Sequence, residues 1–400
     1  MNIKLITTKW AAGLLSMALT AGVAFADSGA PAPSAKDLGK AIEKVNYVET
    51  DTAGVKLSGY VDVGYIYNFI GKGSYAVTRG YNGSDSHSGG DFNVNAVKLT
   101  LEKALTEKNE FQAGFRVDTF IGKDWSDFDP ANGEPGGNAS TLYLQQAYVE
   151  VRVPVGNGLD VQFGKIGSIL GFEADERPAN LNITQGFNAT IDPGPSAGVL
   201  ANYHATDSVD VLFGVNNGNG LDYNPGLDTS NDGYAFVGGV NFHHDNFESQ
   251  LTGSIEPWGD EAYTNDNVTV YGVNWWTTWS PKFADDKLLL ALNTSYWYAS
   301  NLDPSVTRFP GSFASAALYA KYQFTDLFSL AGRGEYVNAN DGETNNYWSF
   351  TLTAGFNVAE NLLLRAEYRF DTGHDVVYNY ATDSGNNSSH TVAVEAVYSF

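Results

Sequence analysis

Cysteine is absent from this 400-residue chain, and basic residues are half as frequent as acidic ones. Without cysteine, the fold must be stable without the disulfides that many secreted domains require. The 23 lysines and arginines stand against 46 aspartates and glutamates, a formal net charge of −23. Because nucleic-acid binding needs a basic surface, this balance argues against nucleic acid as a partner.

Long apolar runs are also missing after the first 26 residues. A membrane-spanning helix needs about 20 consecutive apolar residues, so the sequence predicts no such helix. The first 26 residues differ, because Lys4 and Lys9 precede or flank an apolar stretch that ends in the small-x-small triplet Ala24-Phe25-Ala26. This order predicts a cleaved signal peptide at 1–26 and export of the mature chain.

The segment 27–54 has its own character. DSGAPAPSA predicts a flexible leader, and KDLGKAIEKVN predicts a short helix with Ser34 as its N-cap and Asp37 in a capping box. A leader without fixed structure explains the same composition equally well. Either way, this periplasmic leader precedes the main domain, which we place at 55–400.

Glycine and aromatic residues are abundant, with 43 Gly, 23 Tyr, 23 Phe and 8 Trp, a composition typical of strands and turns. From residue 55 onward, polar and apolar residues alternate in runs of about 9–11 residues, the length of a tilted membrane strand. Sixteen such runs are predicted, at 55–67, 94–103, 111–121, 142–153, 159–166, 195–204, 208–216, 234–243, 247–255, 268–279, 288–298, 313–324, 328–337, 347–357, 362–370 and 390–400.

The connections between these runs alternate strictly between short and long. Short ones such as PVGNG, ATDS and HHDN alternate with long ones at 68–93, 122–141, 167–194, 217–233, 256–267, 299–312, 338–346 and 371–389. Bacterial outer-membrane barrels have short periplasmic turns and long extracellular loops. The sequence therefore predicts an all-β fold, a transmembrane antiparallel β-barrel of about 16 strands.

The alternation separates charged from apolar side chains. In LLLRAEYRF (362–370), the two arginines and the glutamate share one face, and leucine and aromatic residues share the other. A charge on the lipid face costs about 2–4 kcal/mol for Arg or Lys, so the charged face lines the lumen. The predicted inward charges are Lys98, Arg116, Arg152, Lys321, Arg333, Arg365 and Arg369 with Asp62, Glu102, Asp118, Glu150, Glu335, Glu367 and Glu395.

Aromatic residues gather near the predicted strand ends, as the interfacial girdles of membrane barrels require. We assign to these girdles Tyr65, Tyr67, Trp275, Trp276, Trp279, Tyr296, Trp297, Tyr298, Tyr319, Tyr322, Phe324 and Trp348. The final run, HTVAVEAVYSF, alternates up to its last residue, Phe400. We expect this strand to pair with the first one and close the barrel, which leaves no open sheet edge.

The chain resembles outer-membrane porins, and LSGYVDVGYIYNF (57–69), QAYVEVRVPVGNGLDVQFGKIGSILGFE (146–173) and PSAGVLANYHATDSVDVLFGVNNG (195–218) resemble the porin-2, or OmpL-like, family of β-barrel porins. The resemblance implies an outer-membrane channel. A terminal aromatic such as Phe400 looks like the signal that outer-membrane assembly machinery reads. In the general trimeric porins, a more distant comparison, the third long loop folds into the lumen and sets an acidic side against a basic one.

The third long loop here mixes apolar residues with charges. IGSILGFEADERPANLNITQGFNATIDPGP carries Glu173, Asp175, Glu176 and Arg177, whereas other loops are mixtures of Gly, Asn and Asp. An apolar loop is poorly placed in water, so we expect it to fold inward as the pore constriction. Candidate opposing cations are Lys98, Arg116 and Arg152. Alternatively, the inward charges are a network of salt bridges that stiffens the wall.

Acidic residues dominate the other long loops, which predicts a modest preference for cations, unless these residues hold divalent cations beside lipopolysaccharide. The leading function is passive diffusion of ions and small hydrophilic solutes. A sugar-selective facilitator with loop aromatics Tyr75, Tyr81, Trp125 and Trp258 is the alternative, and an adhesin or lipid hydrolase is less favoured. No catalytic residue, metal site or cofactor is expected, and a homotrimer stays open. DTSNDG (228–233) resembles an EF-hand start but lacks the required Glu at its twelfth position, Gly239.

Overall fold

The computed structural model describes residues 48–49, 54–69, 74–76, 89–122, 124, 142–190, 192–217, 234–257, 269–285, 287–300, 311–340, 344–379 and 384–400. The predicted signal peptide and the helix predicted after it lie outside these residues. In the described part of the chain, no helix is long and apolar enough to cross a membrane.

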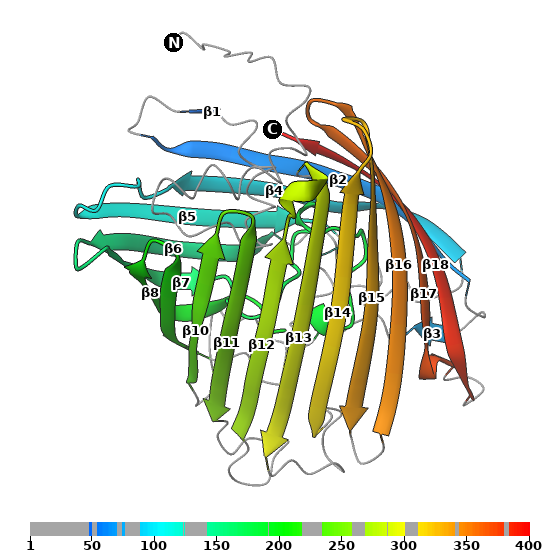
Figure 1. Ribbon diagram of the computed structural model, residues 1–400. Helices are drawn as coiled ribbons and strands as arrows, with labels where there is room; N and C mark the ends of the chain where they lie inside the picture. Colours follow the sequence, from blue (N-terminus) through cyan, green and yellow to red (C-terminus); the bar gives the residue numbers. More distant parts are fainter. Residues whose placement is uncertain are drawn as a thin grey trace.

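Sixteen long antiparallel strands form one closed barrel, as predicted (Figure 1). They are β2 (Lys56–Asn68), β4 (Gly89–Lys103), β5 (Gln112–Ile121), β6 (Tyr143–Val153), β7 (Leu159–Ile166), β8 (Ser196–Thr206), β9 (Val209–Asn216), β10 (Ala235–His244), β11 (Phe247–Pro257), β12 (Thr269–Trp279), β13 (Leu288–Ser300), β14 (Ser312–Gln323), β15 (Phe328–Asn340), β16 (Thr344–Ala359), β17 (Leu362–Asn379) and β18 (Ser384–Ser399). Two short strands, β1 (Val48–Glu49) and β3 (Ser74–Ala76), pair with β2 and with the end of β17.

The last strand closes the barrel against the first. β18 pairs antiparallel with β2 from Thr391↔Asn68 to Ser399↔Tyr60. Phe400 continues this ladder, because its N–H donates to the Gly59 carbonyl at 2.9 Å and its carbonyl accepts from the Gly59 N–H at 3.0 Å. Neither β2 nor β18 therefore presents an unpaired edge to the lipid.

Tight connections gather at one end of the barrel, the end at which the chain terminates (Figure 1). They are the segments 104–111, 154–158, 207–208, 245–246, 280–287, 324–327 and 360–361, the fifth containing the 3-10 turn η5 (Lys282–Ala284). Asp245 and Asp285 adopt the left-handed conformation that such turns need, with φ of 48° and 49°. Lys282 donates to Asp245 at 2.9 Å and lowers the pKa of that exposed carboxyl.

The strands on the long-loop side reach further than the sequence predicted. The expected loops at 338–346 and 371–389 are largely strand, and pairing continues to Asn340↔Thr344 and to Asn379↔Ser384. Beyond the lipid both faces of a strand meet water, so the apolar alternation stops while the backbone hydrogen bonds continue. The alternation therefore predicts the membrane portion of a strand and not its full length.

Three aromatic residues assigned to the girdles lie on the opposite face. Trp276, Trp297 and Tyr319 point inward, with exposed fractions of 1%, 5% and 3%. Their neighbours Trp275 and Tyr296 are outward, at 42% and 51%. Consecutive residues in a strand must point to opposite faces, so the girdle assignment was wrong for Trp276 and Trp297. It was also wrong for Tyr319, whose neighbour Leu318 is the outward residue.

The outward face predicts a simple stability test. Leu318, near the middle of β14, is 65% exposed toward the lipid. Leu318→Arg is expected to lower the free energy of unfolding by about 2–4 kcal/mol, the cost of an arginine at the bilayer midplane. Urea titration of the refolded barrel in liposomes measures it. Gln162→Arg, on the inner face beside Glu150, is the matched control, and an equal loss in both variants would contradict the assignment of faces.

Candidate pore constriction

The loop between β7 and β8, residues 167–195, lies inside the barrel. Phe172 packs on Tyr319 and Trp276 of the inner wall, with ring centroids 4.8 and 6.1 Å apart. Leu170 and Phe187 join a second buried cluster, whose wall members are Val270, Trp297, Ala299, Phe313 and Val337. Burying one such side chain contributes about 1.5–3 kcal/mol. The inward aromatic residues thus form the apolar surface against which the loop packs.

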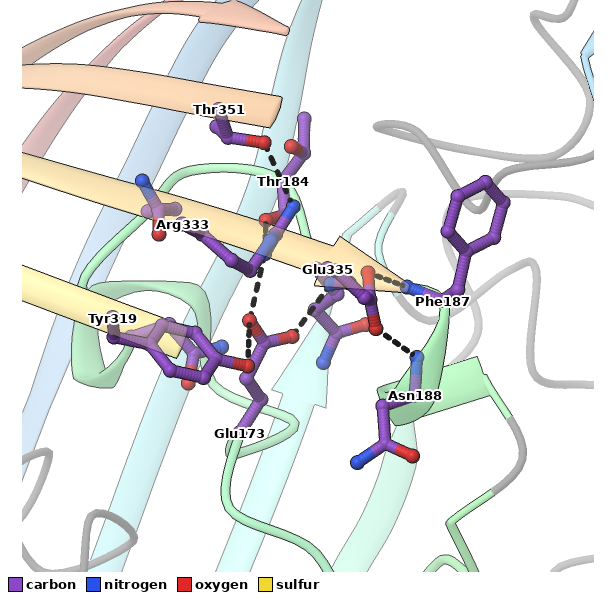
Figure 2. A network of polar contacts seen from close by, with 12 residues as sticks. Glu173, Thr184, Phe187, Asn188, Tyr319, Arg333, Glu335 and Thr351 are labelled. Atoms are coloured by element: carbon purple, nitrogen blue, oxygen red, sulfur yellow. Dashed lines mark hydrogen bonds and ion pairs between the residues drawn. The ribbon is translucent and has the colours of Figure 1, made fainter. Parts of the chain in front are cut away.

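Two wall glutamates accept hydrogen bonds from the loop backbone. The Glu335 carboxylate accepts from the N–H groups of Phe187 and Asn188 at 2.7 and 2.6 Å (Figure 2). The Glu367 carboxylate accepts from the N–H groups of Ile183 and Thr184 at 2.5 and 3.0 Å. A loop without regular structure leaves such N–H groups without partners, which is costly when they are buried. The wall supplies the missing acceptors.

Three wall arginines satisfy the loop carbonyls in the same way. Arg333 donates to the Thr184 carbonyl at 2.7 Å, Arg365 to the Asn180 carbonyl at 2.8 Å and Arg369 to the Gln185 carbonyl at 2.5 Å. Arg365 also reaches the Arg177 carbonyl at the start of the 3-10 turn η3 (Arg177–Ala179). The inward charges of β15 and β17 therefore bind the loop.

Glu173 is part of this anchor. Its carboxylate accepts from Arg333 at 2.7 Å, from the Tyr319 hydroxyl at 3.2 Å and from the Gly186 N–H at 2.6 Å (Figure 2). Gly186 passes so close to the wall that a Cβ there would lie 2.8 Å from a Glu335 oxygen. A larger residue at this position would require the Glu335 carboxylate to shift.

Asp175 and Glu176 occupy a different position, because both are partly exposed to the lumen whereas Glu173 and Arg177 are buried. Glu176 accepts from Lys98 at 2.7 Å, and Asp175 accepts from Gln145 at 3.4 Å. Partial burial opposes ionisation of Glu176, but the Lys98 ammonium outweighs it and holds the pKa of this loop carboxyl below its ordinary value. Arg177 donates to Asp124 at 2.6 Å.

The predicted opposing cations do not act alike. Lys98 reaches the loop, whereas Arg116 donates to Asp118 and Glu102 at 2.8 and 3.0 Å. Arg152 pairs with Asp160 at 2.6 Å. Three other predicted wall charges also have partners on the inner face: Asp62 accepts from Asn95 at 2.8 Å, Glu150 from Gln162 at 3.4 Å and Glu395 from Arg365 at 2.5 Å. Wall salt bridges and a loop contact thus coexist.

Sequence reasoning missed a second polar cluster, close to the tight turns. It comprises Asp160, His204, Asp210 and His243, which lie beside Arg152. The alternation in LDVQFGK and ANYHAT already places Asp160 and His204 on the inner face. No sequence pattern, however, shows that residues from five strands converge there.

Residues 54–400 match the family model described as "Putative beta-barrel porin-2, OmpL-like". The chain belongs to this porin family. Among solved structures, the porin is similar to the outer-membrane channel DcaP of Acinetobacter baumannii, with 13% identity, a TM-score of 0.60 and coverage of 88% of this chain and 99% of that one. OmpF of Salmonella typhi gives 13%, 0.60, 88% and 100%, and OprB of Pseudomonas putida 14%, 0.59, 87% and 94%. No curated protein matches it by sequence.

The family and the closed barrel together make this porin an outer-membrane channel. At these low identities the solved structures show the fold alone. The position of the anchored loop rests on its own contacts with the inner wall.

The anchors predict a conductance phenotype. Glu335→Gln with Glu367→Gln replaces one oxygen of each carboxylate by an amide nitrogen that cannot accept a loop N–H group, and it removes the charge from the oxygen that remains. Each lost charge-assisted hydrogen bond is worth about 1.5–3 kcal/mol, so the loop should leave the wall. Planar-bilayer recordings are expected to show noisier and altered single-channel conductance. Glu360→Gln, in an exposed tight turn, is the control, and unaltered traces for the double variant would contradict the anchoring role.

Proposed function

We propose that this porin passes ions and small hydrophilic solutes by passive diffusion, that the loop 167–195 is its constriction, and that the loop makes the channel mildly cation-selective. The proposal rests on a difference in exposure to the lumen among the loop carboxylates. Arg333 neutralises the buried Glu173. Glu176 pairs with Lys98 at 2.7 Å but, like Asp175, keeps part of its surface in the lumen. A negative charge at a narrow point raises the local cation concentration.

The loop contacts explain why the constriction should have a fixed shape. Its anchors run from residue 173 to residue 188 and reach β14, β15 and β17. Such a network leaves the loop few alternative positions. The loop also reaches the β4–β7 wall, where Glu176 accepts from Lys98 and Asp175 accepts from Gln145.

The alternative functions draw no support from the described residues. Of the loop aromatics proposed for sugar binding, Tyr81, Trp125 and Trp258 lie outside them. A lipid hydrolase needs a nucleophile beside a histidine on the outer wall, whereas His390 on that wall is hydrogen-bonded to the Tyr368 hydroxyl at 2.7 Å. The porin family and the closed barrel favour a non-enzymatic channel.

Charge neutralisation tests the proposed selectivity. Asp175→Asn with Glu176→Gln should lower the ratio of K⁺ to Cl⁻ permeability by about twofold, because two lumen charges are lost. The reversal potential in a KCl gradient measures it. Glu173→Gln is the matched comparison and should destabilise the loop without a comparable change in ion preference. Equal permeability ratios in wild type and the double variant would overturn the selectivity assignment.

We also propose that Phe400 is read by the outer-membrane assembly machinery. Its ring is 36% exposed at the closing strand, and its backbone completes the ladder with Gly59. Phe400→Ala should reduce the folded fraction in cells, seen as loss of the heat-modifiable band, while refolding into detergent proceeds normally. Phe324→Ala, an outward aromatic at a tight turn, is the control. Normal assembly of the Phe400 variant would refute the proposal.

Association of three copies also belongs to the proposal. One similar solved structure, with 12% identity and a TM-score of 0.57, is OmpT of Vibrio cholerae in a trimer form. Chemical cross-linking of this porin in the outer membrane distinguishes a trimer from a monomer. Lipopolysaccharide is a further proposed partner in the bilayer.

A further inference from the structure

Five charged or titratable side chains converge on the inner wall near the tight turns. Each comes from a different strand: Arg152 from β6, Asp160 from β7, His204 from β8, Asp210 from β9 and His243 from β10. Arg152 also donates to the Thr106 carbonyl in the turn 104–111. The backbone N–H of His204 donates to the Gly158 carbonyl in the turn 154–158. These two bonds place the cluster at the tight-turn end of the lumen, remote from the loop anchors.

His204 lies between two carboxylates. Its Nδ1 is 2.7 Å from the Asp210 Oδ1, and its Nε2 is 3.1 Å from the Asp160 Oδ2. A neutral imidazole has one N–H donor and one lone pair, whereas an imidazolium has two donors. Only the imidazolium can donate to both carboxylates, so this geometry favours a cationic His204.

The neighbours of His204 set the charge of the cluster. Arg152 lies 3.5 Å from its Nε2 and pairs with Asp160, and His243 lies 3.5 Å from Asp210. Glu248 of β11 stands opposite His243 in the register, and Glu150 lies two residues from Arg152 on the inner face. With His204 cationic, Arg152 and His204 balance Asp160 and Asp210. Loss of one proton leaves this group with one net negative charge.

We propose that His204 is a selectivity-determining residue, whose protonation sets the charge of the lumen wall at the tight-turn end and makes the cation preference of the channel depend on pH. The side chains are near the water of the lumen, since 16% of the Asp160 side chain and 5% of the His204 side chain are exposed. Deprotonation of His204 adds a negative charge, so cation preference rises with pH. The inference rests on the proposed diffusion function.

Two substitutions hold residue 204 in a neutral or a cationic state at every pH. In wild type, the ratio of K⁺ to Cl⁻ permeability, from reversal potentials between about pH 5.5 and 9.5, should rise by about twofold, the effect of one unit charge several ångströms from the ion path. His204→Gln should hold the ratio at the high-pH value throughout. His204→Arg, a permanent cation, should hold it at the low-pH value. His244→Gln, an exposed histidine of the 245–246 turn region, should keep the wild-type profile.

Asp160→Asn is a second test of the pH-dependent selectivity. It removes one of the two carboxylates that stabilise the imidazolium, so the same transition should move to lower pH. The proposal fails if wild type shows no pH-dependent change, or if both His204 variants retain it. Failure of the constriction proposal is distinguishable, because there the Asp175 and Glu176 variants would leave selectivity unchanged while the His204 profiles still separate.

Discussion

The constraint on which the lumen depends is the need to pair every buried backbone N–H and carbonyl of an irregular loop. Strands satisfy one another within the barrel, but the loop 167–195 has no such partner. Glu335, Glu367 and the arginines of β15 and β17 supply acceptors and donors in place of water. The charged side chains of the wall therefore bind the backbone of the loop. They lie together on the inner face of the sheet because they occupy every second position of their strands.

Apolar packing and charge pairing act on the same segment and support each other. Phe172 and Phe187 rest on inward aromatic residues, and this contact excludes water from the hydrogen bonds beside them. Exclusion of water strengthens the ion pair of Arg333 with Glu173 and makes a missing partner more costly. A buried pair that loses one member typically costs about 3–5 kcal/mol. Such a site tolerates few substitutions, and the two partly exposed carboxylates, Asp175 and Glu176, are the exceptions.

Much of the fold and part of the site could be predicted from alternation alone. The strand at 159–166 was predicted to the residue, and the inward position of Arg365, Glu367 and Arg369 follows from the same rule. The girdle assignment placed both Trp275 and Trp276 outward because aromatic residues are frequent near strand ends. Alternation, however, allows only one of two consecutive residues to point outward. Partner choice is different. That Glu173 meets Arg333 and not Arg152 depends on how the loop crosses the lumen, which is a property of three-dimensional packing that spacing along the chain does not encode.

The separation of the anchors along the chain has a consequence for how the barrel is built. The backbone N–H of Asn188 is bound by a residue 147 positions later, and that of Ile183 by one 184 positions later. The loop therefore has these acceptors only when β15 and β17 stand beside it in the sheet. Without them its buried backbone polar groups must be bound by water. The fixed position of the loop is consequently a property of the closed barrel and not of the segment 167–195 alone.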